Sequence, residues 1–249
     1  MNTLTGIEDI LFPPRCVICG ELLECSYRAF LCPNCIKGIH FITSPLCLRC
    51  GIPFSADQER DHLCGECLAE KKPYAIARSV ATYEGTILKA IHKFKYHRKT
   101  GIGKVLGNIM ADFVSGIWDI KAFDLIMPVP LHIKRLRERG FNQAVILARV
   151  LSKRFNISLD LSSLRRTLLT LPQVGLGRKE RLLNVKGAFS IIDQNQISGK
   201  RILLVDDVYT TGGTLMECSR VLIAAKAEAV AVLTMARAIG ENDSKEGEK

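Results

Sequence analysis

Residues 202–214 read Ile202-Leu-Leu-Val-Asp206-Asp207-Val-Tyr-Thr210-Thr211-Gly212-Gly213-Thr214. The apolar run is typical of a buried strand that carries two carboxylates to its carboxyl end, where open α/β sheets bind ligands. Glycines let backbone N–H groups approach a ligand closely, and a helix that begins at this turn attracts an anion. The pattern therefore predicts a sugar diol at Asp206 and Asp207. It places a monophosphate at Thr210, Thr211, Gly212, Gly213 and Thr214.

Two other phosphate-binding motifs are excluded at this turn. No Gly-Lys-Ser/Thr follows, as a P-loop would require, and the G-x-G-x-x-G spacing of dinucleotide-binding folds is absent. An aspartate helix cap followed by a glycine turn would explain one carboxylate and one glycine, but not the whole set.

The rest of the chain alternates between expected strands and helices. Strands are expected at 123–129, 157–164, 201–205 and 228–236, and helices at 86–96, 102–118, 142–155 and 213–226, with Asn142 as a cap. Residues 165–187 are expected to form a long basic loop or a short helix. Alternation with continuous apolar strands predicts an α/β fold, a parallel sheet covered by helices on both faces.

Nine of the ten cysteines precede residue 70, and eight of them form four C-x-x-C pairs. Two such pairs supply the four thiolates of a tetrahedral zinc site, which is closed and therefore structural. The pairs repeat about 31 residues apart, which favours two sequential sites, although an interleaved arrangement has similar spacing. The predicted ligands are Cys16, Cys19, Cys32 and Cys35 for one site, and Cys47, Cys50, Cys64 and Cys67 for the other. Cys218 is expected to be a buried apolar side chain.

Charge is unevenly distributed along the 249 residues. Residues 71–186 hold 23 basic and 7 acidic residues, whereas residues 1–70 and 187–249 carry net charges of −4 and −2. The cationic middle favours a polyanionic or phosphorylated partner, or simply a soluble surface. A hydrophobic fraction of 47% excludes a disordered chain, and no apolar run reaches the roughly 20 residues of a membrane span. The N-terminus lacks a signal-peptide pattern, so a cytoplasmic protein is expected.

Three motifs together resemble one known family. Residues 202–214 resemble the 5-phosphoribosyl-1-pyrophosphate (PRPP) signature of type I phosphoribosyltransferases. The segments 127–144, MPVPLHIKRLRERGFNQA, and 173–189, QVGLGRKERLLNVKGAF, are similar to hallmarks of the ComF family, although Gly177 stands where that family often has Ser or Thr. The resemblance implies a double zinc-ribbon module over 1–72, a phosphoribosyltransferase-like domain over 73–239 and a disordered polar tail over 240–249.

The resemblance also implies roles for the basic residues. In this fold the loop after the first strand holds pyrophosphate, here through Arg135, Arg137 and Arg139. A flexible loop closes over the site, here with Arg178, Lys179 and Arg181. Asp206 and Asp207 take the catalytic position, and Mg²⁺ accompanies PRPP. Cations and metal on the departing pyrophosphate would stabilise an oxocarbenium-like transition state.

Three functions follow from the resemblance. One is phosphoribosyl transfer to an unidentified acceptor. The second is binding of single-stranded DNA together with the DNA-uptake machinery of natural transformation, and the third is PRPP sensing without turnover. Residues 89–104 interleave cations with Phe94 and Tyr96, which suits stacking on bases. An amphipathic helix with Phe94 in the core explains the same pattern. Members of this fold often dimerise, which implies a homodimer.

Overall fold

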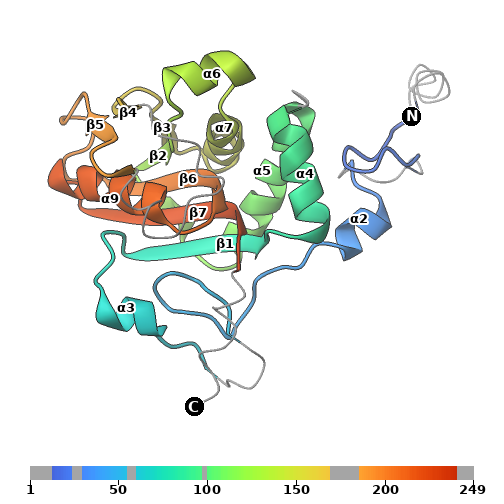
Figure 1. Cartoon of the computed structure of the whole chain (residues 1–249), viewed down its shortest axis with the longest axis horizontal. Coiled ribbons are helices and arrows are strands. Elements are labelled where there is room, and N and C mark those ends of the chain that lie inside the picture. The colour runs from blue at the N-terminus through green and yellow to red at the C-terminus, as the bar shows by residue number, and fades with distance from the viewer. Residues whose placement is uncertain (1–12, 24–29, 55–59, 97–99, 169–184, 240–249) are drawn as a thin grey trace.

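A five-stranded parallel sheet lies at the centre of the computed structural model, which describes residues 13–23, 30–54, 60–96, 100–168 and 185–239 (Figure 1). The strand order is β1-β7-β6-β2-β3, and each neighbouring pair is parallel. The strands are β1 (Ile76–Thr82), β2 (Leu125–Pro128), β3 (Ser158–Leu159), β6 (Arg201–Tyr209) and β7 (Ala229–Arg237). The predicted α/β class with a parallel sheet is confirmed.

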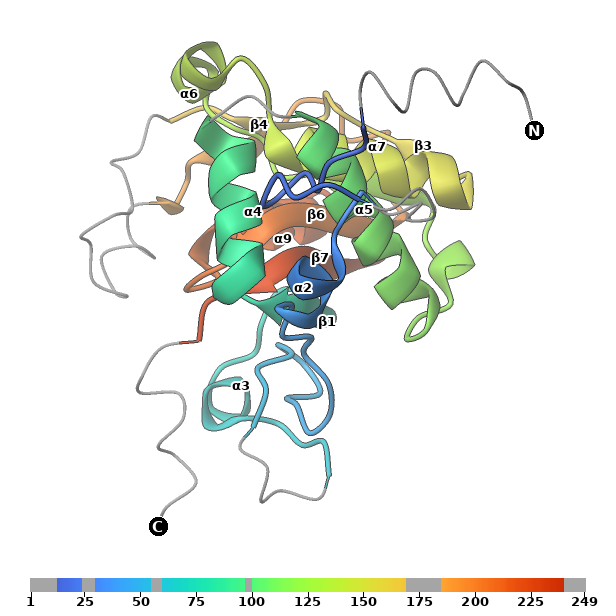
Figure 2. The ribbon, with the colours of Figure 1, turned by 90° about the vertical axis from the view of Figure 1, so that its right-hand side faces the viewer.

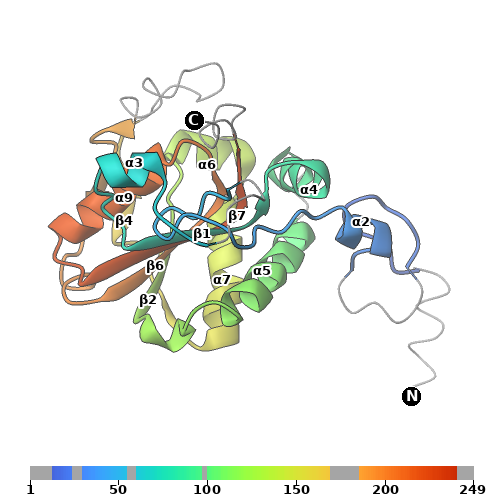
Figure 3. The same ribbon diagram turned by 90° about the horizontal axis from the view of Figure 1, so that it is seen from below.

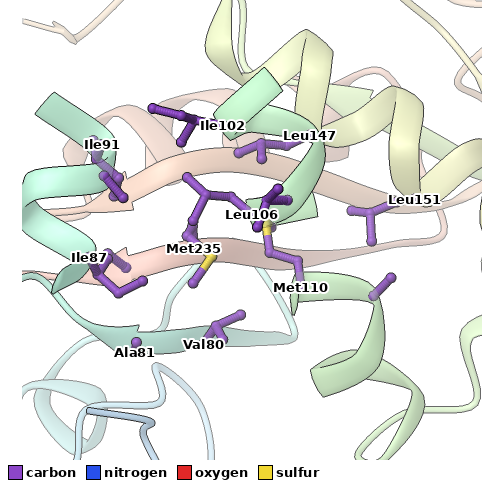
Figure 4. Close-up of a cluster of buried hydrophobic side chains, with 14 of the residues drawn as sticks. Val80, Ala81, Ile87, Ile91, Ile102, Leu106, Met110, Leu147, Leu151 and Met235 are labelled. Atoms are coloured by element: carbon purple, nitrogen blue, oxygen red, sulfur yellow. The ribbon is translucent and has the colours of Figure 1, made fainter. Parts of the chain in front are cut away.

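Helices cover both faces of this sheet (Figure 3). One face packs against α4 (Gly85–Tyr96), α5 (Thr100–Ser115) and α7 (Gln143–Phe155), and the other against α9 (Gly213–Ala224). Figure 4 shows Leu106, Met110 and Leu147 from the first group meeting Met235 of β7. Because both faces are buried, the central strands β6 and β7 are mostly apolar, as the sequence indicated. The Asn142 side chain accepts a hydrogen bond from the Ala144 amide and caps α7.

Two predicted elements differ from the structure. The strand expected at 157–164 is divided, because the Asp160 carboxylate accepts hydrogen bonds from the amides of Ser162 and Ser163 and turns the chain. After this turn, β4 (Leu164–Arg166) pairs antiparallel with β5 (Phe189–Ile191). The segment with Arg135, Arg137 and Arg139, which was expected to be a loop, contains a helix, α6 (Ile133–Arg139). This helix ends at Gly140, whose φ is 80°. A short 3-10 helix, η1, spans Ile120–Ala122.

The cysteine-rich segment lies along the β1 edge of the sheet (Figure 2). It contains two short helices, α2 (Pro33–Lys37) and α3 (Gly65–Ala69). The amide of Ala77 donates to the carbonyl of Arg49, and the amide of Ile42 donates to that of Val80. These bonds occupy backbone groups that an edge strand would otherwise expose. Gly20 and Gly51, which each follow a C-x-x-C pair, have positive φ values of 87° and 69°.

Candidate functional site

A cavity opens at the carboxyl ends of β2 and β6, the edge of a parallel sheet where ligands bind. Its walls come from the segment after β2, from α4, α6 and β4, and from the turn between β6 and α9. The lining residues are Lys95, Val129, Pro130, Leu131, Arg135, Arg139, Arg166, Asp206, Asp207, Val208, Thr210, Gly212, Thr214 and Leu215. Segments far apart in sequence thus converge on the predicted Asp-Asp-Thr-Gly motif.

Asp206 and Asp207 lie near the carboxyl end of β6, within the strand, which continues to Tyr209. The Asp207 amide donates a hydrogen bond of 2.8 Å to Oδ1 of Asp206. Burial, together with the neighbouring Asp207 carboxylate, raises the pKa of Asp206 to about 8. Two close carboxylates resist double ionisation, which favours the protonated form of Asp206.

Lys95, which the sequence indicated only as part of the basic segment 89–104, forms an ion pair with this acidic pair. Nζ of Lys95, from the end of α4, lies 2.6 Å from Oδ2 of Asp207, and the two side chains are 19% and 12% exposed. Burial opposes the lysine charge, but the attraction of Asp207 outweighs it and raises the pKa of Lys95. Residue 95 stands 112 positions from Asp207 in the chain, so no local spacing reveals the contact.

The turn after β6 has the geometry that the glycines predicted. Gly212 has φ of 77° and caps α9, whose first residue is Gly213. A Cβ at Gly212 would lie 2.4 Å from Oη of Tyr209, so the ring of Tyr209 supports the turn directly. Oη of Tyr209 is 2.8 Å from Oη of buried Tyr74. Thr210, Gly212 and Thr214 line the cavity, whereas Thr211 and Gly213 are not among the lining residues.

Three arginines face the cavity, and one of them was not predicted. Arg135 and Arg139 of α6 line it, whereas Arg137 on the same helix is exposed and is not a lining residue. Arg166 of β4 also lines the cavity, with its guanidinium 5.3 Å from the centre of the Phe189 ring. Burial, with a contribution from Arg135, lowers the pKa of Arg166. The predicted residues Arg178, Lys179 and Arg181 lie outside the described residues.

The cysteine pairs converge in sequential order on two clusters. Within the set Cys16, Cys19, Cys32 and Cys35, and within the set Cys47, Cys50, Cys64 and Cys67, all sulfur atoms lie within 4.8 Å of one another. A tetrahedron with zinc–sulfur bonds of about 2.3 Å separates its sulfurs by about 3.8 Å. The Cys19–Cys32 and Cys50–Cys64 sulfur distances are 3.6 and 3.7 Å, so both clusters fit the ion.

Backbone groups also favour thiolates at these clusters. The amides of Cys50 and Cys64 both lie 3.4 Å from Sγ of Cys47, and the amide of Cys35 lies 3.4 Å from Sγ of Cys32. Donors directed at sulfur stabilise its negative charge. None of the nine cysteines that the structure describes forms a disulfide, and Cys218 is buried among apolar side chains, as predicted.

A buried arginine joins the second cysteine cluster to the turn after β6. Arg237, at the end of β7, is 6% exposed. Its Nη1 donates a hydrogen bond of 2.8 Å to the Cys50 carbonyl, and its Nη2 lies 3.8 Å from Sγ of Cys50. The same guanidinium lies 4.1 Å from the centre of the Tyr209 ring, which supports Gly212. The second cysteine cluster and the cavity therefore share one buried network.

Phe94, the first aromatic residue of the segment 89–104, is not available to stack on a base. Phe94 is fully buried, and its ring centre is 5.5 Å from that of Phe141, so it is core rather than a stacking platform. Lys93 donates to the carbonyl of Ile18 and ties α4 to the first cluster. The Tyr96 side chain and residues 97–99 lie outside the described part of the chain.

Comparisons with known proteins agree with this arrangement. The family description "Double zinc ribbon domain" matches residues 7–68, and "Phosphoribosyl transferase domain" matches residues 138–249. Together with the sulfur geometry, the first match supports two structural zinc sites. Among the helices of the described residues, none is long and apolar enough to cross a membrane.

Curated proteins are similar over nearly the whole chain. "Competence protein F" of Haemophilus influenzae is 32% identical over 90% of this chain and 97% of its own length. "DNA utilization protein YhgH" of Escherichia coli is 30% identical over 91% and 98%. "Competence protein ComFC" of Bacillus subtilis is 30% identical over 93% and 97%.

Proposed function

We propose that this chain, which belongs to the ComF family of competence proteins, binds a phosphoribosyl ligand of the PRPP type in the cavity beside β6. The observation that carries the proposal is the set of side chains that one cavity brings together. Asp206 and Asp207 of β6, the arginines Arg135, Arg139 and Arg166, and residues of the turn after β6 all line it.

Each part of the ligand has a matching group. Carboxylate oxygens accept hydrogen bonds from the ribose diol, and the backbone of the turn with its threonine hydroxyls holds the 5-phosphate. Arginine forks match pyrophosphate oxygens, and Mg²⁺ enters with the pyrophosphate. Arg178, Lys179 and Arg181 would close over the bound ligand.

We extend the proposal to phosphoribosyl transfer. The bond between C1 of the ribose and pyrophosphate would break as an acceptor nucleophile bonds to C1, and the arginines would stabilise the departing anion. The acceptor is unidentified. Pyrophosphate release from PRPP, measured across a panel of amine, base and hydroxyl acceptors, tests this step. No release with any acceptor would leave a PRPP-sensing protein without turnover.

Calorimetric titration of PRPP with Mg²⁺ tests binding itself. We expect ribose 5-phosphate and pyrophosphate each to bind more weakly than PRPP, because each fills only part of the cavity. Asp206→Asn with Asp207→Asn should abolish the diol contribution, whereas Arg149→Met, an exposed site on α7, should not change affinity. Equal affinity of the double variant and the natural protein would refute the placement of the diol.

A role in DNA uptake is the second candidate, and the names of the aligned relatives favour it. In this role the chain binds single-stranded DNA and acts with the uptake machinery. Binding through many phosphates weakens steeply with salt, so anisotropy of a labelled single strand at two salt concentrations measures it. Affinity that does not change with salt, or no binding at low salt, would remove this candidate.

We also propose the division of the chain that the sequence indicated, with residues 1–72 as the zinc-ribbon module and 73–239 as the ligand-binding domain. The two family matches, at 7–68 and 138–249, support this division.

A further inference from the structure

The acidic pair of the cavity is already neutralised by the protein. Asp207 forms its ion pair with Lys95 at 2.6 Å, and burial with the neighbouring Asp207 favours the protonated form of Asp206. Among the described lining residues, Lys95, Arg135, Arg139 and Arg166 are cationic. A free divalent cation that entered the cavity would therefore meet four positive groups and at most two negative ones.

Lys95 also occupies the oxygen that a metal would need. Hard cations such as Mg²⁺ bind carboxylate oxygens directly, and Oδ2 of Asp207 is in contact with the lysine ammonium. The lysine is held in place because α4 packs on the sheet through Ile87, Ile91 and Phe94, all fully or almost fully buried. Its 19% exposure leaves it little freedom to turn away into solvent.

We propose that Lys95 is the resident counter-ion of Asp207 and takes the place of a protein-bound divalent cation at the diol end of the cavity. Metal then enters the site only with the pyrophosphate of the ligand. Lys95 is a positioning residue, since it acts on the ligand by fixing the charge and orientation of Asp207. The statement about the ligand rests on the proposed function, whereas the statement about the metal does not.

Titration of the protein with Mn²⁺ alone tests the metal statement without any ligand. The bound fraction is measured as the loss of the electron paramagnetic resonance signal of unbound Mn²⁺. The natural protein should show no Mn²⁺ site tighter than millimolar. Lys95→Met removes one positive charge beside Asp207 and should bind Mn²⁺ at least about tenfold more tightly, because a divalent ion gains from that lost repulsion. Lys89→Met, an exposed lysine of the same helix, is the matched control and should behave as the natural protein does.

Two results would overturn the inference. One is equal Mn²⁺ affinity of Lys95→Met and the natural protein when both show the same zinc content and the same circular dichroism. The other is a tight Mn²⁺ site in the natural protein that Asp207→Asn removes, and this measurement decides the matter even where Lys95→Met fails to fold. Lys95→Arg keeps the charge and should retain the weak Mn²⁺ binding.

The ligand statement has its own readout. The ratio of PRPP affinities with and without Mg²⁺ should be about tenfold larger in Lys95→Met than in the natural protein, since the variant needs a cation at Asp207. An unchanged ratio would refute this part. If the natural protein binds no PRPP under any condition, the proposed function fails, and the Mn²⁺ titration still decides the role of Lys95.

Discussion

Replacing Arg237 by methionine tests how the second cysteine cluster supports the turn after β6. The guanidinium donates to the Cys50 carbonyl at 2.8 Å and lies 4.1 Å from the centre of the Tyr209 ring. A hydrogen bond from a charged donor contributes about 1.5–3 kcal/mol, and a cation–π contact contributes about 0.5–1 kcal/mol or more when desolvated. Methionine keeps the length and the apolar stem but loses both interactions. We expect the free energy of unfolding to fall by about 2–4 kcal/mol.

Urea denaturation measures this loss as a lower midpoint with an unchanged slope, because the surface exposed on unfolding stays nearly the same. Zinc should also leave the Arg237→Met variant faster in the presence of a chromogenic chelator. Arg237→Lys should not restore stability, since an ammonium cannot place a planar fork over the ring. Arg149→Met is the control, because this exposed arginine should change stability by less than about 0.5 kcal/mol. A stability of Arg237→Met within about 1 kcal/mol of the natural protein would refute the reasoning.

Three further changes test other parts of the molecule. Phe94→Ala should lower the free energy of unfolding by about 3–5 kcal/mol in a urea titration, because the ring is fully buried. The affinity of the folded variant for single-stranded DNA should be unchanged. A neutral effect on stability would contradict the core position of Phe94. The raised pKa of Asp206 means that the folded protein keeps a proton that the unfolded chain releases, so ligand-free stability should fall as pH rises from about 4 to about 8. Asp206→Asn should flatten that slope, and an identical slope in the variant would show that another group causes it. Elemental analysis should find two zinc ions per chain, and chelation should lower the melting temperature; a metal-free protein of equal stability would remove the zinc assignment.

Local patterns in the sequence were sufficient for much of this protein. The cysteine pairs predicted two clusters, because a C-x-x-C turn brings its own two thiolates together. The strand that carries Asp206 and Asp207 near its carboxyl end, and the glycine turn after it, follow from residues adjacent in the chain. Asn142 identified a helix start for the same reason. The interruption at Asp160 was missed, although the Asp-Leu-Ser-Ser run there is a turn signal that could have found it.

The composition of the site, in contrast, was decided by tertiary structure. The sequence alone predicted an Asp-Asp-Thr-Gly motif at the end of a strand, two thiolate clusters and a cationic middle segment. It did not determine that Lys95 would neutralise Asp207, that Arg166 would replace Arg137 at the cavity wall, or that Arg237 would connect a metal cluster to Tyr209. A helix directs side chains to all sides and a strand directs them alternately to two faces. Which cation faces which carboxylate is therefore settled only by packing. Phe94 and Lys95 are neighbours in the basic segment 89–104. In the folded protein Phe94 lies in the core, whereas Lys95 lines the cavity.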